Sequence, residues 1–180
     1  MKRTIFTIIA GAALLTSCSQ NKEYVIHGTV NDPNLEGAKI YLVPLENATV
    51  ETIDSVYVEN QSFEFRGTEE KIADIRIERR RRLGMQNLLV ITEPGEIYVT
   101  IGRVSSSGGT AQNDSLQVWK DLTKEYHQTS SDLIRAGKRG QVKAVREAYV
   151  ARTRQMAENV GNKSTLGIFL NGRFKETRDK

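Results

Sequence analysis

The sequence has few of the side chains that build reactive centres. Its 180 residues include one cysteine, Cys18, and two histidines, His27 and His127. A disulfide, a CxxC redox pair and a cysteine metal cluster each need at least two cysteines, so none of them can form within the chain. Two histidines also make a histidine-rich metal site unexpected. No cofactor is therefore expected, although a site built from carboxylates stays open.

Long apolar runs are scarce as well. The longest occupies residues 5–15, which is shorter than the roughly 20 residues that span a bilayer. Two basic residues, Lys2 and Arg3, precede this run, and small polar residues follow it. This is the order of an export signal. Residues 1–17 are therefore predicted to be a signal peptide, and no later segment is apolar enough to cross a membrane.

The tetrad LTSC at positions 15–18 resembles the lipobox of bacterial lipoproteins. The resemblance implies a diacylglycerol on the Cys18 sulfur, cleavage after Ser17 and an acyl chain on the new N-terminus. About two acyl chains already give stable anchoring, so Cys18 is the expected lipid attachment site and residues 18–23 a polar tether. The alternative is an ordinary secretory signal with a chance cysteine. Lipidation would consume the only thiol and leave no cysteine nucleophile.

The residue after the cysteine bears on location. Ser19 stands where many lipoproteins retained at the inner membrane carry aspartate. We therefore expect a protein of the cell envelope, anchored at the outer membrane on its periplasmic or surface face.

The first half of the chain has the pattern of β-structure. Turn sequences such as NDPNLEG and ENQ separate short runs rich in β-branched and aromatic residues. Several runs alternate apolar with polar residues, as half-buried strands do: YVIHGTV, AKIYLVPL, SVYVENQSFEFRG, ADIRIER, NLLVITEPG and EIYVTIGR. No long helical pattern interrupts them, which argues against a doubly wound α/β fold. Residues 24–103 are predicted to form an antiparallel β-sandwich or a partly open barrel.

The second half changes period. The stretch VSSSGGT predicts a flexible linker at residues 104–112. Beyond it, two groups of apolar residues recur at helical spacing, and the glycines of AGKRGQ separate them. Residues 113–170 are predicted to form an antiparallel helical hairpin and a short helix, with Asn113 or Asp114 as the first cap. Residues 171–180 form a charged tail. The expected fold class is mainly β with an α-helical C-terminal extension, that is, α+β.

Several phrases, in this order behind a lipobox, resemble a known family. They are YVIHGTV, AKIYLVP, IDSVYVENQSFEFRG, ITEPGEIYVTI and GGTAQND. They are similar to the domain of unknown function at the N-terminus of many Bacteroidetes envelope lipoproteins. The resemblance implies a β-sandwich that leads into a helical region, often followed by a thioredoxin-like domain. The sequence stops at Lys180, before such a domain could start, so the family's thiol-disulfide activity is not expected here.

Charge is distributed unevenly along the chain. Residues 19–103 hold 10 basic and 14 acidic residues, a net charge of −4, whereas residues 104–180 hold 14 basic and 8 acidic residues, a net charge of +6. This asymmetry indicates either two differently used surfaces or two solvated faces.

The run ERRRRLG is the most unusual feature, because four arginines stand side by side at positions 79–82. Arginine binds phosphates and carboxylates through two parallel hydrogen bonds. We therefore consider Arg79, Arg80, Arg81 and Arg82 a possible anion-binding cluster for lipopolysaccharide, an acidic glycan or an acidic envelope protein. The alternative is a solvated strand end. Nucleic-acid binding suits the arginines but not the compartment.

Other candidate residues have simpler structural explanations, which we prefer. Asp54 with Ser55 suggests a nucleophile pair, but no histidine is near in sequence to act as its base, and a strand start is expected. Glu93 with Glu96 could bind a hard cation, but solvated turn acids are expected. His27 is expected to be a satisfied polar residue of the first strand. Trp119 could be a ligand platform, but its helical spacing with Leu116 favours core packing.

These observations favour a non-catalytic, lipid-anchored binding module whose partner is unknown. One alternative is an accessory role in an envelope thiol-redox or stress system whose thioredoxin-like domain lies on another chain. A second is a hydrolase that uses carboxylates.

Cys18→Ser should abolish lipid labelling, because the thiol is the acceptor of the diacylglycerol. Cells fed a palmitate analogue should label the wild type only, and the variant should leave the membrane fraction. A variant that stays labelled and membrane-bound would show that the anchor is elsewhere.

Replacing all four residues of the arginine cluster with Gln should preserve the melting temperature, because exposed ion pairs contribute only about 0–1 kcal/mol each. If the cluster binds anions, the variant should lose affinity for lipopolysaccharide or an acidic glycan. Wild-type binding should also weaken with salt, since attraction is screened over about 10 Å at 0.1 M ionic strength. Equal, salt-insensitive titrations of both proteins would leave the arginines as a solvated turn.

Overall fold

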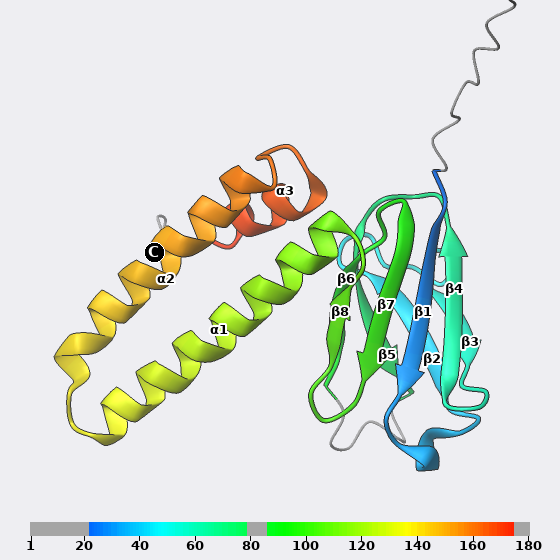
Figure 1. Ribbon diagram of the computed structural model, residues 1–180, viewed down its shortest axis with the longest axis horizontal. Helices are drawn as coiled ribbons and strands as arrows, with labels where there is room; N and C mark the ends of the chain where they lie inside the picture. The colour runs from blue at the N-terminus through cyan, green and yellow to red at the C-terminus, as the bar shows by residue number, and fades with distance from the viewer. Residues whose placement is uncertain (1–21, 79–85, 175–180) are drawn as a thin grey trace, which may run out of the picture.

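The computed structural model describes residues 22–78 and 86–174, and within these ranges the chain has an α+β fold. Two four-stranded sheets come first in the sequence and three α-helices follow. Figure 1 shows the sheets lying one behind the other, with a helical hairpin projecting away from them. The order of elements therefore matches the predicted β-rich first half and helical second half.

The first sheet has the strand order β4-β1-β7-β8, and the second has the order β3-β2-β5-β6. The strand bounds are β1 Tyr24–Val30, β2 Lys39–Pro44, β3 Asp54–Tyr57, β4 Ser62–Gly67, β5 Ile72–Ile77, β6 Leu88–Ile91, β7 Gly95–Ile101 and β8 Ser106–Gly108. A 3-10 turn, Pro33–Leu35, connects β1 to β2. The six runs recognised in the sequence contain seven of these strands.

The expectation of wholly antiparallel sheets is wrong for one pair. Strand β1 runs parallel to β7 and antiparallel to β4, so the first sheet is mixed, whereas the second sheet is antiparallel throughout. A short turn imposes antiparallel pairing on the strands that it joins. Strands β1 and β7 are separated by five other strands, so no turn fixes their relative direction.

One cluster of buried side chains draws on both sheets. Strands β1, β4 and β7 contribute Ile26, Phe65 and Ile97, and the second sheet contributes Ile40 and Ile75, all at most 1% exposed. In β4 the buried and exposed residues alternate strictly, as expected for a strand with one solvated face. Burial of this apolar surface is the main term that stabilises the β-region.

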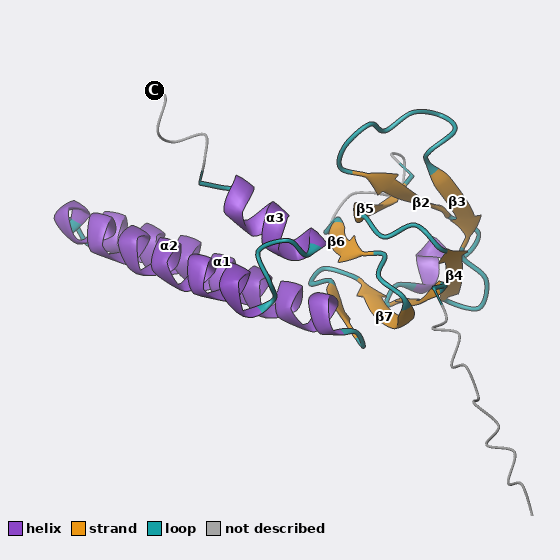
Figure 2. Ribbon diagram, turned by 90° about the horizontal axis from the view of Figure 1, so that it is seen from above, coloured by secondary structure: helices purple, strands orange, loops and turns teal. Residues whose placement is uncertain are grey.

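The helices are α1 Ala111–Arg135, α2 Val142–Asn159 and α3 Thr165–Gly172, with a 3-10 turn at Arg139–Gln141. Helices α1 and α2 form the predicted hairpin, and α3 is the predicted last short helix. Seen from above, the hairpin extends well beyond the sheets (Figure 2). Among the described helices, none combines the length and hydrophobicity needed to cross a bilayer.

A second buried cluster attaches the helices to the second sheet. Ile91 of β6 packs with Leu116 and Trp119 of α1, and Leu166 and Leu170 of α3 complete the contact. The polar side chain of Gln112 extends the same junction, because its Oε1 accepts the backbone N–H of Leu166 at 2.9 Å. Among the described residues, the hairpin is thus held at one end, by α3 and the first turns of α1.

The predicted flexible linker at residues 104–112 is replaced by regular structure. Ser106–Gly108 form β8, which pairs with β7, and α1 begins at Ala111 rather than at residue 113. Three small polar residues carry no periodic signal, so only their pairing partner identifies them as a strand.

Side chains of α1 satisfy the outer edges of both sheets. Strands β6 and β8 are edge strands, whose outward N–H and C=O groups have no strand partner. The buried amide of Asn113 accepts from the Ile91 N–H at 3.0 Å and donates to the Ile91 carbonyl at 2.8 Å. Gln117 Oε1 accepts the N–H of Ser107 at 3.0 Å. Asn113 is therefore an edge partner. The prediction of Asn113 or Asp114 as the cap is wrong, because Thr110 occupies the N-cap position.

Asn113→Ala should lower the free energy of unfolding by about 2–4 kcal/mol, because it leaves two buried backbone groups of Ile91 without partners. Urea unfolding measures the change. The matched control is Asn159→Ala at the exposed end of α2, which should stay within about 0.5 kcal/mol of wild type. Equal midpoints for the two variants would show that this edge does not depend on the amide.

Candidate functional site

The two sites predicted with a functional role lie outside the described residues. They are the lipid attachment residue Cys18 and the arginine cluster Arg79, Arg80, Arg81 and Arg82. Both stay predictions.

The carboxylates considered in the sequence take separate positions. Asp54 accepts the backbone N–H of Ser55 at the start of β3, at 2.7 Å. Glu93 Oε1 accepts the backbone N–H groups of Gln112 and Asn113 at 2.7 and 3.1 Å, in the first turn of α1. A carboxylate there satisfies unpaired donors and complements the helix dipole. Glu93 therefore stabilises α1, and no pair with Glu96 is needed to explain it.

His27 is a paired polar residue, as expected. Its ring contacts Glu96 through Nε2 and Glu64 through Nδ1, the latter at 3.5 Å, and stacks on Tyr98. These residues lie on three adjacent strands of the first sheet. Within residues 22–78 and 86–174, no group of three or more His, Cys, Asp or Glu side chains is arranged to hold a metal ion.

Trp119 is a core residue, as preferred from its helical spacing. It is 4% exposed, and its ring meets Phe169 of α3 edge-on at a centroid distance of 5.4 Å. The guanidinium of Arg173 lies 5.9 Å from the indole centroid. The residue therefore packs α1 against α3.

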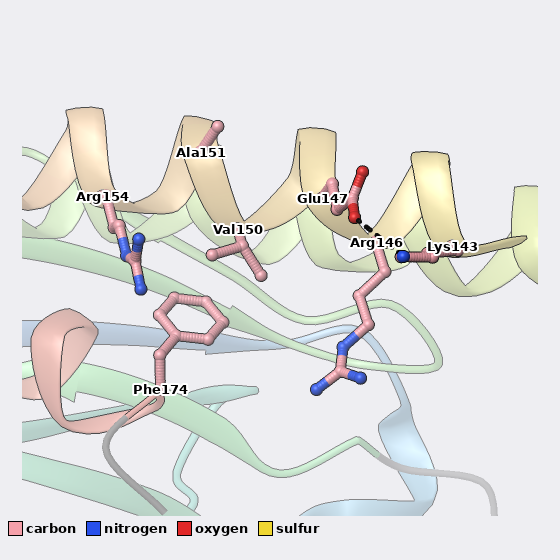
Figure 3. Close-up of a pocket in the computed structure, with 7 residues that line it drawn as sticks. All are labelled: Lys143, Arg146, Glu147, Val150, Ala151, Arg154 and Phe174. Carbon is pink, nitrogen blue, oxygen red and sulfur yellow. Dashed lines mark ion pairs between the residues drawn. The ribbon is translucent and has the colours of Figure 1, made fainter. Parts of the chain in front are cut away.

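The hairpin of α1 and α2, called the helical arm below, carries a groove that the sequence analysis did not identify (Figure 3). It runs along α2, faces the chain segment just after α3, and has a volume of about 420 Å³. Its lining residues are Lys143, Arg146, Glu147, Val150, Ala151, Arg154 and Phe174. Figure 3 shows the guanidinium groups of Arg146 and Arg154 extending to the same side as the Phe174 ring, with Val150 between them.

An aromatic contact positions the apolar part of this groove. Phe174 meets Tyr149 edge-on at a centroid distance of 6.1 Å, and Tyr149 stacks on Tyr126 of α1 at 4.6 Å. The hydroxyl of Tyr149 also hydrogen-bonds Thr123 at 3.0 Å. Phe174 is thus held against the inner face of the hairpin while its ring borders the groove.

The groove has an excess of unpaired positive charge. Its one carboxylate, Glu147, lies 3.9 Å from the ammonium of Lys143. Among the described residues neither Arg146 nor Arg154 forms an ion pair, and both side chains are exposed. Two guanidinium groups that flank an apolar surface are suited to an anion with an apolar body.

The sequence does contain a signal for this groove. Lys143, Arg146, Val150 and Arg154 are spaced by three, four and four residues, which places them on one face of a helix. Hydrophobic spacing predicts the helix, and the spacing of its charges marks this face. The contribution of Phe174 has no local signal, because it depends on how α3 returns to α2.

Comparison with models of protein families gives one match, to the family described as "Domain of unknown function (DUF4369)", over residues 24–116. This range starts with β1 and ends in the second turn of α1. Comparisons with curated proteins and with solved structures give no match.

Proposed function

The chain belongs to the DUF4369 family, whose model matches residues 24–116, more than half of its length, and from this premise we propose that it is a non-catalytic binding module of the bacterial cell envelope. In this proposal the lipid on Cys18 anchors the chain at the outer membrane. Residues 18–23 separate the anchor from the folded part. The order of basic, apolar and lipobox residues at the N-terminus supports the anchor.

The scaffold in this proposal is a β-sandwich. A cluster of buried apolar residues supplied by both sheets supports face-to-face packing. The helical arm would then be the part of the molecule that projects from the sandwich (Figure 1). Its attachment at one end leaves most of α1 and α2 available to a partner (Figure 1).

The observation that carries the proposal is the pair of guanidinium groups beside Phe174, which form no ion pair within the described part of the chain. Arginine is always charged and offers donors but no acceptor, so Arg146 and Arg154 can bind an anion but cannot exchange protons at neutral pH. The groove therefore suits recognition rather than catalysis. Its apolar floor of Val150, Ala151 and Phe174 adds a requirement for an apolar group between the negative charges.

An acidic protein segment meets both requirements best. An apolar side chain flanked by carboxylates can bury its body against Phe174 while the carboxylates reach Arg146 and Arg154. An acidic glycan offers charge without an apolar side chain. Lipopolysaccharide offers phosphates, but its acyl chains lie within the membrane.

The double variant Arg146→Gln, Arg154→Gln should bind an acidic peptide of the pattern Glu-Leu-Glu about tenfold or more weakly than wild type, assuming about 1 kcal/mol per charged hydrogen bond. Fluorescence anisotropy of the labelled peptide measures the affinity. Wild-type affinity should also fall with salt, because both guanidinium groups are exposed.

The matched control is Lys138→Gln, Arg139→Gln at the hairpin turn, which removes the same charge away from the groove. Loss of binding in both variants would mean that net charge matters and the groove does not. Parallel titrations with purified lipopolysaccharide and with alginate identify the alternatives. Tighter, groove-dependent binding to either would replace the acidic protein as partner.

A further inference from the structure

A separate cavity lies along α1, where Lys120 reaches the edges of both sheets. Its volume is about 510 Å³, within the range of about 300–1,000 Å³ typical of small-molecule sites. Seven of its eight lining residues come from α1, and the eighth is Gln86, just before β6. Among the described residues, the lining contains two lysines and a histidine but no carboxylate.

Lys120 lies at the inner end of this cavity. Its ammonium group donates to Ser107 Oγ of β8 at 2.8 Å and to the Leu89 carbonyl of β6 at 3.3 Å. Both acceptors are neutral, and within the described residues Lys120 forms no ion pair. A half-buried ammonium is normally paired with a carboxylate, because desolvation of an unpaired charge is costly.

Burial lowers the pKa of Lys120 to about 8, and the neighbouring Asp121 opposes this shift only in part. Asp121 is exposed and accepts a hydrogen bond from Gln117 instead. The other titratable groups that line the cavity are Lys124 and His127, both on α1. Strands β6 and β8 carry no titratable side chain. Within residues 22–78 and 86–174, the ammonium of Lys120 thus lacks a negative partner.

The other groups around Lys120 define the surroundings of an anion bound there. Lys120, Lys124 and His127 are spaced by four and three residues, so they follow one face of α1 from the inner end toward the solvent. Two of the three N–H groups of Lys120 are used, which leaves one for a ligand. The indole N–H of Trp119, which also lines the cavity, is buried without an acceptor in the described part of the chain.

We propose that this cavity binds a small organic carboxylate, with Lys120 as its principal ligand and with Lys124 and His127 at the rim. One free N–H at the inner end suits one carboxylate oxygen. A phosphate, with three acceptor oxygens, would need more buried donors than the cavity supplies. The site is separate from the groove on α2, so it does not depend on the function proposed for that groove.

Trp119 provides the measurement, because it is the only tryptophan in the chain and lines the cavity. Acetate, succinate and citrate should each change its emission saturably in the full-length protein in detergent, whereas sodium chloride at equal ionic strength should not. Lys120→Met should weaken succinate binding by about tenfold or more, because it removes a charged hydrogen bond. Lys138→Met, at the exposed hairpin turn, is the matched control and should bind as wild type does.

The pH dependence tests the charge directly. A bound carboxylate favours protonated Lys120, so succinate affinity should be highest below about pH 8 and should fall as pH rises above the free-protein pKa of about 8. If Lys120→Met fails to fold, the rim variant Lys124→Met still tests the site and should lose about threefold in affinity. The proposal is wrong if no carboxylate gives a saturable response or if Lys120→Met binds succinate as wild type does. Binding of inorganic phosphate but not of succinate would overturn the choice of a carboxylate.

Discussion

The unpaired backbone groups on the outer edges of β6 and β8 constrain the rest of the structure. Each sheet ends in a short strand whose outward donors and acceptors need partners, and α1 supplies them through Asn113, Gln117 and Lys120. Polar side chains of α1 thus bind the edge backbone groups that a further strand would otherwise bind. This arrangement protects two edges from pairing with other chains and sets the direction in which the helical arm leaves the sheets.

The same arrangement explains why the two sides of the arm differ chemically. On the side of the sheets, Lys120 donates a hydrogen bond to an edge carbonyl and is half-buried. Its charge has no negative partner among the residues that the structure describes. On α2 the arginines stay in solvent, where an unpaired charge costs little. A half-buried lysine favours a small ligand that fits a cavity, whereas exposed guanidinium groups beside Phe174 favour a larger partner.

Sequence patterns predicted where the strands and helices lie better than which strands pair and which side chains meet. Alternation located the long strands because one face of each is buried, and Phe63 and Phe65 of β4 illustrate this directly. The parallel pairing of β1 with β7 had no local signal, since distant segments approach each other only in the folded chain. Asn113 or Asp114 was the expected cap because asparagine and aspartate favour that position, but burial against Ile91 gives Asn113 a different role.

The sequence by itself determined which chemistries are absent and where the elements lie. One cysteine excludes an internal disulfide, and the two periodicities separate a β-rich half from a helical half. These properties follow from composition and from side chains close together along the chain. Only the tertiary structure decided that Lys120 lies between two sheet edges and that Phe174 returns to α2. Both depend on contacts between residues far apart in the sequence, whose desolvation and packing exist only after the chain has folded.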